Sequence, residues 1–354
     1  MKKDVSAFKV AATYIGTVIG AGFASGQEIL QFFSIFGAMG FWGVIVVTLL
    51  FMLFGYIILE MGYLLNSKSH LEVIKTAGGK VTGRIIDYII TFFLFGGLTA
   101  MIAGCGAIFA QQFKLPSILG NAAMAIITVL TVLTGINGVI NSISFIVPFL
   151  LISVVGVSIV SLFTVPAYIS NTINSIINPA NLTRNWLWAA ILYTSYNTLM
   201  SVAVLAPIGA KAVSRRAIKT GAALGGLGLG IGALSIHLAI LRNFNSVSDL
   251  EVPMAFIAGS ISYTIQIIYS VVLIAEIYTT AVANLYGFSA RITDTEKHGA
   301  RSIITATCIF ALIASMLGFS TLVKYLYPIV GYGGVLLLTC LLYTKFKLII
   351  NKEL

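Results

Sequence analysis

The sequence predicts an all-α protein that crosses a membrane many times. Of its 354 residues, 58% are hydrophobic and 9% are charged, and the mean hydropathy is +1.01. No charged side chain occurs from Leu115 to Thr183, whereas a soluble domain needs a charged surface over such a length. The apolar runs are continuous rather than alternating, which excludes a membrane β-barrel. We therefore expect a polytopic helical membrane protein that forms one domain over residues 1–354.

The apolar runs define the predicted membrane-spanning helices. A span needs about 20 apolar residues, and on that basis the chain divides into ten spans. Their predicted bounds are 6–34, 37–64, 82–112, 117–134, 141–165, 186–208, 217–240, 254–287, 301–318 and 322–344. Because the number of spans is even, both termini are expected on the same side of the membrane.

Lysine and arginine are distributed unevenly along this layout. Seventeen lie at or near the termini and the connections on the side of the termini, and four lie toward the other side. Because basic residues are retained in the cytoplasm, we expect both termini to be cytoplasmic and the protein to be a multi-pass protein of the plasma membrane. The net charge of +10 therefore reflects topology, and no nucleic-acid partner is expected.

The predicted helices fall into two corresponding sets of five. The third and eighth spans are the long ones, and the first and sixth are unusually polar, so the members of each pair are five positions apart. Two five-helix repeats inserted with opposite topology produce this offset. We expect a 5+5 inverted repeat, with one half over about residues 6–165 and the other over about residues 186–344, in which helices one and six are broken.

Four glycines lie inside the first predicted span, at Gly16, Gly20, Gly22 and Gly26. Glycine is a poor helix former, and an interrupted helix is tolerated in a membrane only where the break is buried in protein or faces a polar cavity. The cluster therefore predicts a binding site near the bilayer midplane. The carbonyl end of such a break suits a cation and the amide end suits a carboxylate, so an amino acid fits it.

The sixth predicted span contains six consecutive side chains with polar groups. The run Tyr-Thr-Ser-Tyr-Asn-Thr extends from Tyr193 to Thr198, so its side chains point all round a helix and cannot all face one neighbour. Unwinding of the helix or a cavity explains them. The alternative is that the hydroxyl groups bond to carbonyls of their own helix while the tyrosines pack against neighbours.

The run Gly-Thr-Val-Ile-Gly-Ala-Gly-Phe from Gly16 to Phe23 resembles the first-helix signature of the amino acid–polyamine–organocation superfamily, whose members share the leucine-transporter fold of ten core helices. Extended to Glu28, the run is similar to that of the YkvI-like membrane permeases of bacteria. The resemblance implies a secondary transporter that holds its substrate between broken helices one and six. The implied substrate-binding residues are Gly20, Ala21, Gly22, Phe23, Tyr193, Ser195, Tyr196 and Asn197.

The same resemblance implies a sodium site. In sodium-coupled relatives the ion lies between carbonyls just before the break in helix one and two adjacent hydroxyl residues on helix eight. The corresponding groups here are the carbonyls of Gly16, Ile19 and Glu276 and the hydroxyls of Thr279 and Thr280. Oxygen ligands of this kind suit a hard cation. Alternatively, the two threonines bond only to their own backbone.

Three acidic residues lie within predicted spans. Glu276 lies near mid-membrane depth with no lysine or arginine at a comparable depth, and a charge there is costly without a partner. We expect Glu276 to carry a coupled proton or to bind a substrate amine, the alternative being a neutral structural acid. Glu28 could lie at a cavity mouth or on a solvated face. Glu60 is expected to extend toward the interface.

These features predict an ion-coupled secondary transporter of a small amino acid or amine that works by alternating access. A bound Na⁺ or a coupled H⁺ is expected and no other cofactor; the expected partners are a small solute and the lipid bilayer. The alternative is a solute-sensing receptor subunit of the same fold that binds without transporting. No Ser-His-Asp set or His-Glu-x-x-His motif predicts an enzyme. Glycines four apart in the seventh span, such as Gly221 and Gly225, predict close helix packing.

Overall fold

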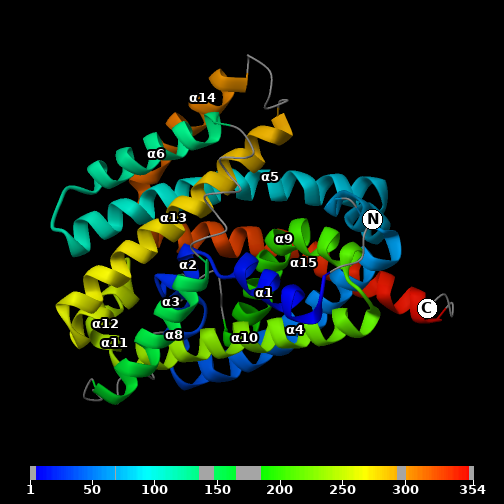
Figure 1. Cartoon of the computed structure of the whole chain (residues 1–354), viewed down its shortest axis with the longest axis horizontal. Helices are drawn as coiled ribbons and strands as arrows, with labels where there is room; N and C mark the ends of the chain where they lie inside the picture. The colour runs from blue at the N-terminus through cyan, green and yellow to red at the C-terminus, as the bar shows by residue number, and fades with distance from the viewer. Residues whose placement is uncertain (1–4, 68, 135–146, 165–184, 293–299, 351–354) are drawn as a thin grey trace.

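The structure is a computed structural model that describes residues 5–67, 69–134, 147–164, 185–292 and 300–350. Over these residues the chain is helical, apart from short connections and one isolated bridge between Val5 and Ala212 (Figure 1). We call the end of the helix assembly where the first helix begins and the last helix ends the terminal end, on the right in Figure 1. The opposite end is the distal end.

The helices follow one another along the chain with short connections. They are α1 (Ala7–Val18), α2 (Ala21–Ala24), α3 (Gln27–Phe32), η1 (Ser34–Phe36), α4 (Ala38–Leu65), α5 (His70–Gln112), α6 (Ser117–Leu133), α8 (Val147–Thr164), α9 (Trp186–Lys211), α10 (Arg215–Arg242), α11 (Phe244–Val247), α12 (Pro253–Ile261), α13 (Tyr263–Ile292), α14 (Ala300–Ala314), η3 (Ser315–Leu317) and α15 (Phe319–Ile350).

Seven helical segments of the described chain are long and apolar enough to cross a membrane, and two further apolar helices, Ser117–Leu133 and Ile152–Phe163, are shorter. Large apolar side chains cover the outer surface. Phe163 is 84% exposed, Phe8 77% and Phe310 65%, as expected for groups that face lipid. The prediction of a multi-pass helical membrane protein is confirmed. The count of ten spans stays a prediction, because residues 141–146 of the fifth predicted span lie outside the described residues.

Two predicted spans differ from the observed helices. The predicted helix 254–287 is divided at Ser262, whose backbone is extended, into the short α12 and the long α13. Helix α5 begins at His70, twelve positions before the predicted start at residue 82, and contains a kink at Gly79. The φ angle of Gly79 is 71°, a left-handed value that a residue with a β-carbon rarely adopts. Local backbone geometry therefore sets both differences.

The long helices form two packed groups. Helices α1, α4, α9 and α10 pack against one another, and helices α5, α6, α13 and α14 form the second group, which lies above the first in Figure 1. Helix α15 lies against both α9 and α5 and so joins the groups. Each group takes two helices from each half of the chain, which is the arrangement a 5+5 repeat produces; the repeat itself stays a prediction.

Glycines let the helices of the first group approach closely. A β-carbon on Gly225 of α10 would lie 2.6 Å from the Tyr14 ring of α1, and one on Gly226 would lie 2.5 Å from the Met52 side chain of α4. Real β-carbons essentially never lie so close to a heavy atom. The packing role predicted for the glycines of this helix is therefore consistent with the structure.

Glu60 does not extend to the interface, and that prediction is wrong. Its side chain is buried between α4 and α15, where it forms an ion pair with Lys345. The Tyr56 hydroxyl donates a second hydrogen bond to Glu60 Oε1 over 2.7 Å. The acid stays inside because a lysine from the last helix reaches it, and this partner lies nearly 300 residues away in the sequence.

Candidate functional site

The first membrane helix is interrupted. Helix α1 ends at Val18, and the next two residues are extended: Ile19 has ψ 105° and Gly20 has φ −121° and ψ −174°. The four residues of α2 follow, and a second interruption occurs at Gly26, whose φ of 80° lies in the left-handed region that favours glycine. The predicted break at the glycine cluster is therefore confirmed, and the structure adds a second one.

The sixth predicted span is not broken, and that part of the prediction is wrong. Helix α9 runs without interruption from Trp186 to Lys211. The Thr194 hydroxyl donates to the carbonyl of Ala190 over 2.9 Å, and the Asn197 amide donates to the carbonyl of Tyr193 over 2.9 Å. Because these polar groups bond to carbonyls one turn back, the helix does not need to unwind to satisfy them.

A cavity of about 550 Å³ lies beside the break, between the two helix groups. Thirteen residues were predicted for the substrate and ion sites, and the cavity wall includes most of them. Those that line it are Gly16, Ile19, Gly20, Ala21, Gly22, Tyr196, Asn197, Glu276, Thr279 and Thr280. The structure thus brings the interrupted helix, α9 and α13 together around one space.

Three predicted binding residues lie away from the cavity. Phe23 is fully buried against α10, where a β-carbon on Gly232 would lie 3.2 Å from its ring. Tyr193 points into an aromatic cluster with Phe33, with ring centroids 4.9 Å apart. The Ser195 hydroxyl donates to the carbonyl of Gly331 on α15 over 2.6 Å. Each side chain is held in packing by a helix that the sequence alone could not place beside it.

Glu28 lies at the closed end of the cavity, next to the break. Its side chain is only 5% exposed, and its Oε2 atom accepts a hydrogen bond from the Tyr196 hydroxyl. A β-carbon on Gly22 would lie 2.8 Å from Cδ of Glu28 and closer still to Oε1. The carboxyl group of Glu28 therefore lies directly over the backbone of α2, and the solvated-face alternative for this residue is wrong.

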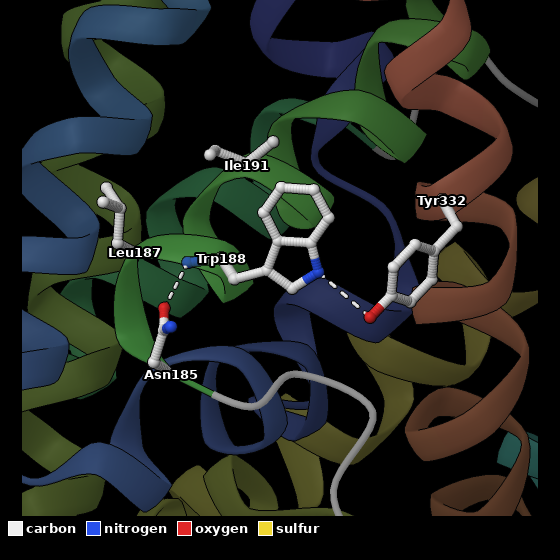
Figure 2. Close-up of a pocket in the computed structure, with 5 residues that line it drawn as sticks. All are labelled: Asn185, Leu187, Trp188, Ile191 and Tyr332. Atoms are coloured by element: carbon white, nitrogen blue, oxygen red, sulfur yellow. Dashed lines mark hydrogen bonds between the residues drawn. The ribbon is translucent and has the colours of Figure 1, made fainter.

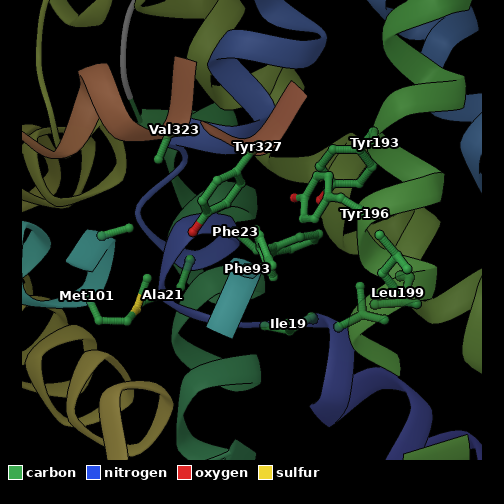
Figure 3. Packing of buried hydrophobic residues seen from close by; sticks show 14 of the residues in the cluster. Ile19, Ala21, Phe23, Phe93, Met101, Tyr193, Tyr196, Leu199, Val323 and Tyr327 are labelled. Carbon is green, nitrogen blue, oxygen red and sulfur yellow. The ribbon is translucent and has the colours of Figure 1, made fainter. Parts of the chain in front are cut away.

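Three aromatic rings surround the same end of the cavity. The ring centroids of Tyr196 and Tyr327 are 5.1 Å apart, those of Phe93 and Tyr327 are 5.4 Å apart, and those of Phe93 and Tyr196 are 5.9 Å apart. In Figure 3 the Tyr327 hydroxyl points toward the segment that carries Ala21. Phe93 and Tyr327 were not predicted, because nothing in the sequence distinguishes them from other aromatic residues in apolar helices.

The predicted cation ligands lie on the opposite wall. The Thr280 hydroxyl lies 3.8 Å from the position that a β-carbon on Gly20 would take, so it faces the break directly. The Thr279 hydroxyl donates to the carbonyl of Glu276 over 2.9 Å. Thr279 therefore bonds to its own helix, as the alternative interpretation proposed for both threonines, whereas Thr280 faces the cavity. Glu276 is 3% exposed and also lines the cavity.

A cluster of charged and polar groups lies at the other limit of the cavity, toward the terminal end. The Arg291 guanidinium on α13 donates to Thr91 Oγ1 over 2.9 Å and pairs with Asp87 on α5 over 2.5 Å. Its second terminal nitrogen lies 2.8 Å from His70 Nε2. His70 and Arg291 both line the cavity. The cavity therefore extends from a buried carboxyl group to an arginine that is already paired.

A second hollow of about 460 Å³ lies at the start of α9 (Figure 2). It is lined by Asn185, Leu187, Trp188, Ile191 and Tyr332. The Asn185 side chain caps α9 by accepting from the backbone of Trp188 over 2.8 Å, and the Trp188 indole donates to the Tyr332 hydroxyl over 3.0 Å. These polar groups have structural partners, and no predicted site residue lies here.

Two proteins of Bacillus subtilis (strain 168) are similar to the chain over nearly its full length. The membrane protein YkvI is 31% identical over 341 residues, which cover 96% of this chain and 96% of YkvI. The protein YyaD is 30% identical over 328 residues, which cover 93% of this chain and 94% of YyaD. No family model matches the chain.

Several solved transporter structures share the helical arrangement. MhsT in complex with L-phenylalanine has a TM-score of 0.60 and 15% identity and covers 95% of this chain and 89% of its own. A variant of the Eremococcus coleocola manganese transporter has a TM-score of 0.58 and 13% identity, with 96% and 77% covered. A Na⁺-coupled sialic acid symporter has a TM-score of 0.55 and 12% identity, with 92% and 75% covered. At these identities the likeness shows the fold alone, which is the leucine-transporter fold. The chain belongs to the family of membrane proteins that includes YkvI and YyaD.

Proposed function

We propose that this protein is an ion-coupled secondary transporter of a small amino acid or amine, working by alternating access. The observation that carries the proposal is the cavity at the interrupted first helix, which lies between two helix groups and is closed at one end only. The structural neighbours support it as transporters of the same fold. Their printed cargoes, L-phenylalanine, manganese and sialic acid, are chemically unrelated, so the fold does not select the solute.

The accessible end of the cavity faces the terminal end of the structure. Ala203 and Ala290, which line the cavity, are exposed there, whereas Glu28 at the other limit is buried. Beyond Glu28, the backbone of Met254 donates to the carbonyl of Ser25 over 3.0 Å, and the Tyr269 hydroxyl donates to the carbonyl of Ala24 over 2.5 Å. With both termini in the cytoplasm, this state is open inward and closed outward.

Two groups on the α13 wall are candidates for the coupling ion. A sodium ion would be held by the carbonyls of Gly16 and Ile19, which lie at the end of α1 and lack the next helical turn, together with the Thr280 hydroxyl and a contribution from Thr279. A proton would be carried by Glu276, which is buried and lies beside Thr279. Oxygen ligands favour the first and a buried acid favours the second.

Gradient-driven uptake into proteoliposomes tests the proposal. Radiolabelled amino acids and amines are supplied with an imposed sodium gradient or an imposed pH gradient. Ala283→Trp places an indole in the cavity wall, and Ile313→Trp places the same group on the outer surface, where Ile313 is 60% exposed. We expect the first variant to lose uptake and the second to keep it. Equal, background-level flux in all samples would contradict transport; saturable binding without flux would indicate a solute-sensing receptor subunit.

A further inference from the structure

We propose that the closed end of the cavity binds an organic cation without a carboxylate group, with Glu28 as its counter-ion. The assignment rests on the proposed function, because it names the class of solute for the same cavity. It replaces the sequence-based expectation that the amide end of the break would hold the carboxylate of an amino acid.

The first step is that the place expected for a substrate carboxylate is already taken. The helix that follows the break, α2, has only four residues, too few to form an extended dipole. The carboxyl group of Glu28 lies over its backbone at Gly22, at the distance where a substrate group would have to lie. A second carboxylate at this position would meet the first in a desolvated space, where like charges repel strongly.

The second step concerns the charges that line the cavity. Its charged or titratable side chains are Glu28, Glu276, His70 and Arg291. Arg291 is paired with Asp87 at the opposite limit of the cavity, beside His70. The half of the cavity near the break therefore presents two acids and no base from the described lining, and a positively charged solute is the one it attracts.

The third step is that Glu28 has no cationic partner within the described part of the chain. The ion pairs found there join His70, Asp87 and Arg291, and Glu60 with Lys345. A carboxylate offers about four acceptor positions, and the Tyr196 hydroxyl fills one of Glu28's. Because a buried charge is costly unless it is paired, an ammonium group arriving from the cavity would supply the missing partner.

The fourth step is the set of ring faces beside this carboxyl group. Tyr196, Tyr327 and Phe93 all line the cavity, with mutual centroid distances between 5.1 and 5.9 Å. A cation is attracted to the face of an aromatic ring within about 6 Å of its centroid. The hydrogen bond to Glu28 fixes the Tyr196 ring in place. A carboxyl group beside three rings is a suitable chemistry for an ammonium ion, and a volume of about 550 Å³ accommodates a small amine with an apolar body.

The test uses pairs of ligands that differ only in a carboxyl group. L-Phenylalanine is compared with phenethylamine, L-leucine with isopentylamine and L-lysine with cadaverine, by calorimetric binding to the purified full chain and by competition for proteoliposome uptake. We expect at least one amine to bind about tenfold or more tightly than its parent amino acid.

Variants of the acid and of one ring assign the effect to this site. Glu28→Gln should weaken amine binding about tenfold or more, while Asp249→Asn, at an exposed carboxylate, should leave it unchanged. Tyr327→Phe keeps the ring face and should retain binding, whereas Tyr327→Leu should lose most of it. Comparing these two tyrosine variants keeps the proposal testable if Glu28→Gln does not fold.

The outcomes separate the inference from the function on which it rests. Amino acids that bind and move better than their amines would overturn the inference and leave the transporter standing. Amine binding that is unchanged in Glu28→Gln and in Tyr327→Leu would also overturn it. If neither class binds or moves, the inference and the proposed function both fail.

Discussion

The carboxyl group of Glu28 lies against the backbone of Gly22, in the space that a β-carbon at position 22 would occupy. Glu28 belongs to α3 and Gly22 to α2, so the short helices around the two interruptions fold back on each other. The glycine is therefore needed for the approach of the protein's own acid.

Gly22→Ala should displace Glu28 and weaken solute binding about tenfold. The added methyl group would overlap Oε1 and Cδ of Glu28, and this flexible side chain can swing aside, so we expect the variant to remain folded. Calorimetric affinity, together with thermal unfolding in detergent, measures both effects. Gly156→Ala is the matched control, because nothing in the structure lies within 4 Å of a β-carbon there. Equal affinities in the two variants would show that Glu28 does not act through Gly22.

Thr280→Val should abolish sodium dependence if sodium is the coupling ion, because it removes a hydroxyl that faces the break and keeps the shape of the side chain. Thr279→Val is the paired variant. Its hydroxyl already donates to the carbonyl of Glu276, so we expect a smaller effect on the sodium concentration needed for half-maximal uptake. If both variants keep the parent's sodium response, the cation lies elsewhere; uptake that requires only a pH gradient would direct attention to Glu276→Gln.

The accuracy of the sequence-based predictions follows the range of the interactions involved. The membrane helices and the interruption at Gly20 were predictable, because hydropathy and glycine content act on the local chain. The continuity of α9 was not predictable, because it depends on whether residues such as Thr194 and Asn197 find carbonyls on their own helix or elsewhere. The sequence contains both possibilities at once.

The site itself was predicted only where it coincides with the break. Tyr196, Thr280 and Glu276 were identified because polar groups are rare in apolar helices. Tyr327 and Phe93 depend on how α15 and α5 pack beside α9, and one sequence carries no signal for that contact. Glu28 was open between two interpretations until its contact with Tyr196, 168 positions away in sequence, was known.

Lys345→Met should destabilise the protein by roughly 3 kcal/mol, the lower end of the range for breaking a buried ion pair. It would leave the Glu60 carboxylate buried with only the Tyr56 hydroxyl as a partner. Replacing both charges, as Glu60→Gln with Lys345→Met, removes the unpaired charge and should recover a large part of the loss. Unfolding by a denaturing detergent gives the free energies. A double variant no more stable than Lys345→Met would mean that the pair contributes in another way.

Gln111→Ala should favour opening of the distal end. The Gln111 side chain on α5 donates to the carbonyl of Val252 over 3.0 Å and accepts from its backbone N–H over 3.1 Å, which fastens the segment before α12. The neighbouring Glu251 accepts from the hydroxyl of Ser320 on α15 over 3.2 Å. Each hydrogen bond contributes about 1 kcal/mol, so losing two should raise the population of a distal-open state by about tenfold or more. The control is Asn245→Ala, at an exposed position of α11.

Accessibility of the cavity from the distal side measures this population. Met101→Cys, in a background without the three native cysteines, places a thiol in the cavity wall. A membrane-impermeant thiol reagent added to the outside of oriented vesicles should label it faster in Gln111→Ala than in Asn245→Ala. Because the hydrogen bonds join α5 to the segment before α12, their loss has no reason to speed labelling from the terminal side. Equal rates from the distal side would show that the closure of this end is held by the apolar contacts of α12 rather than by Gln111.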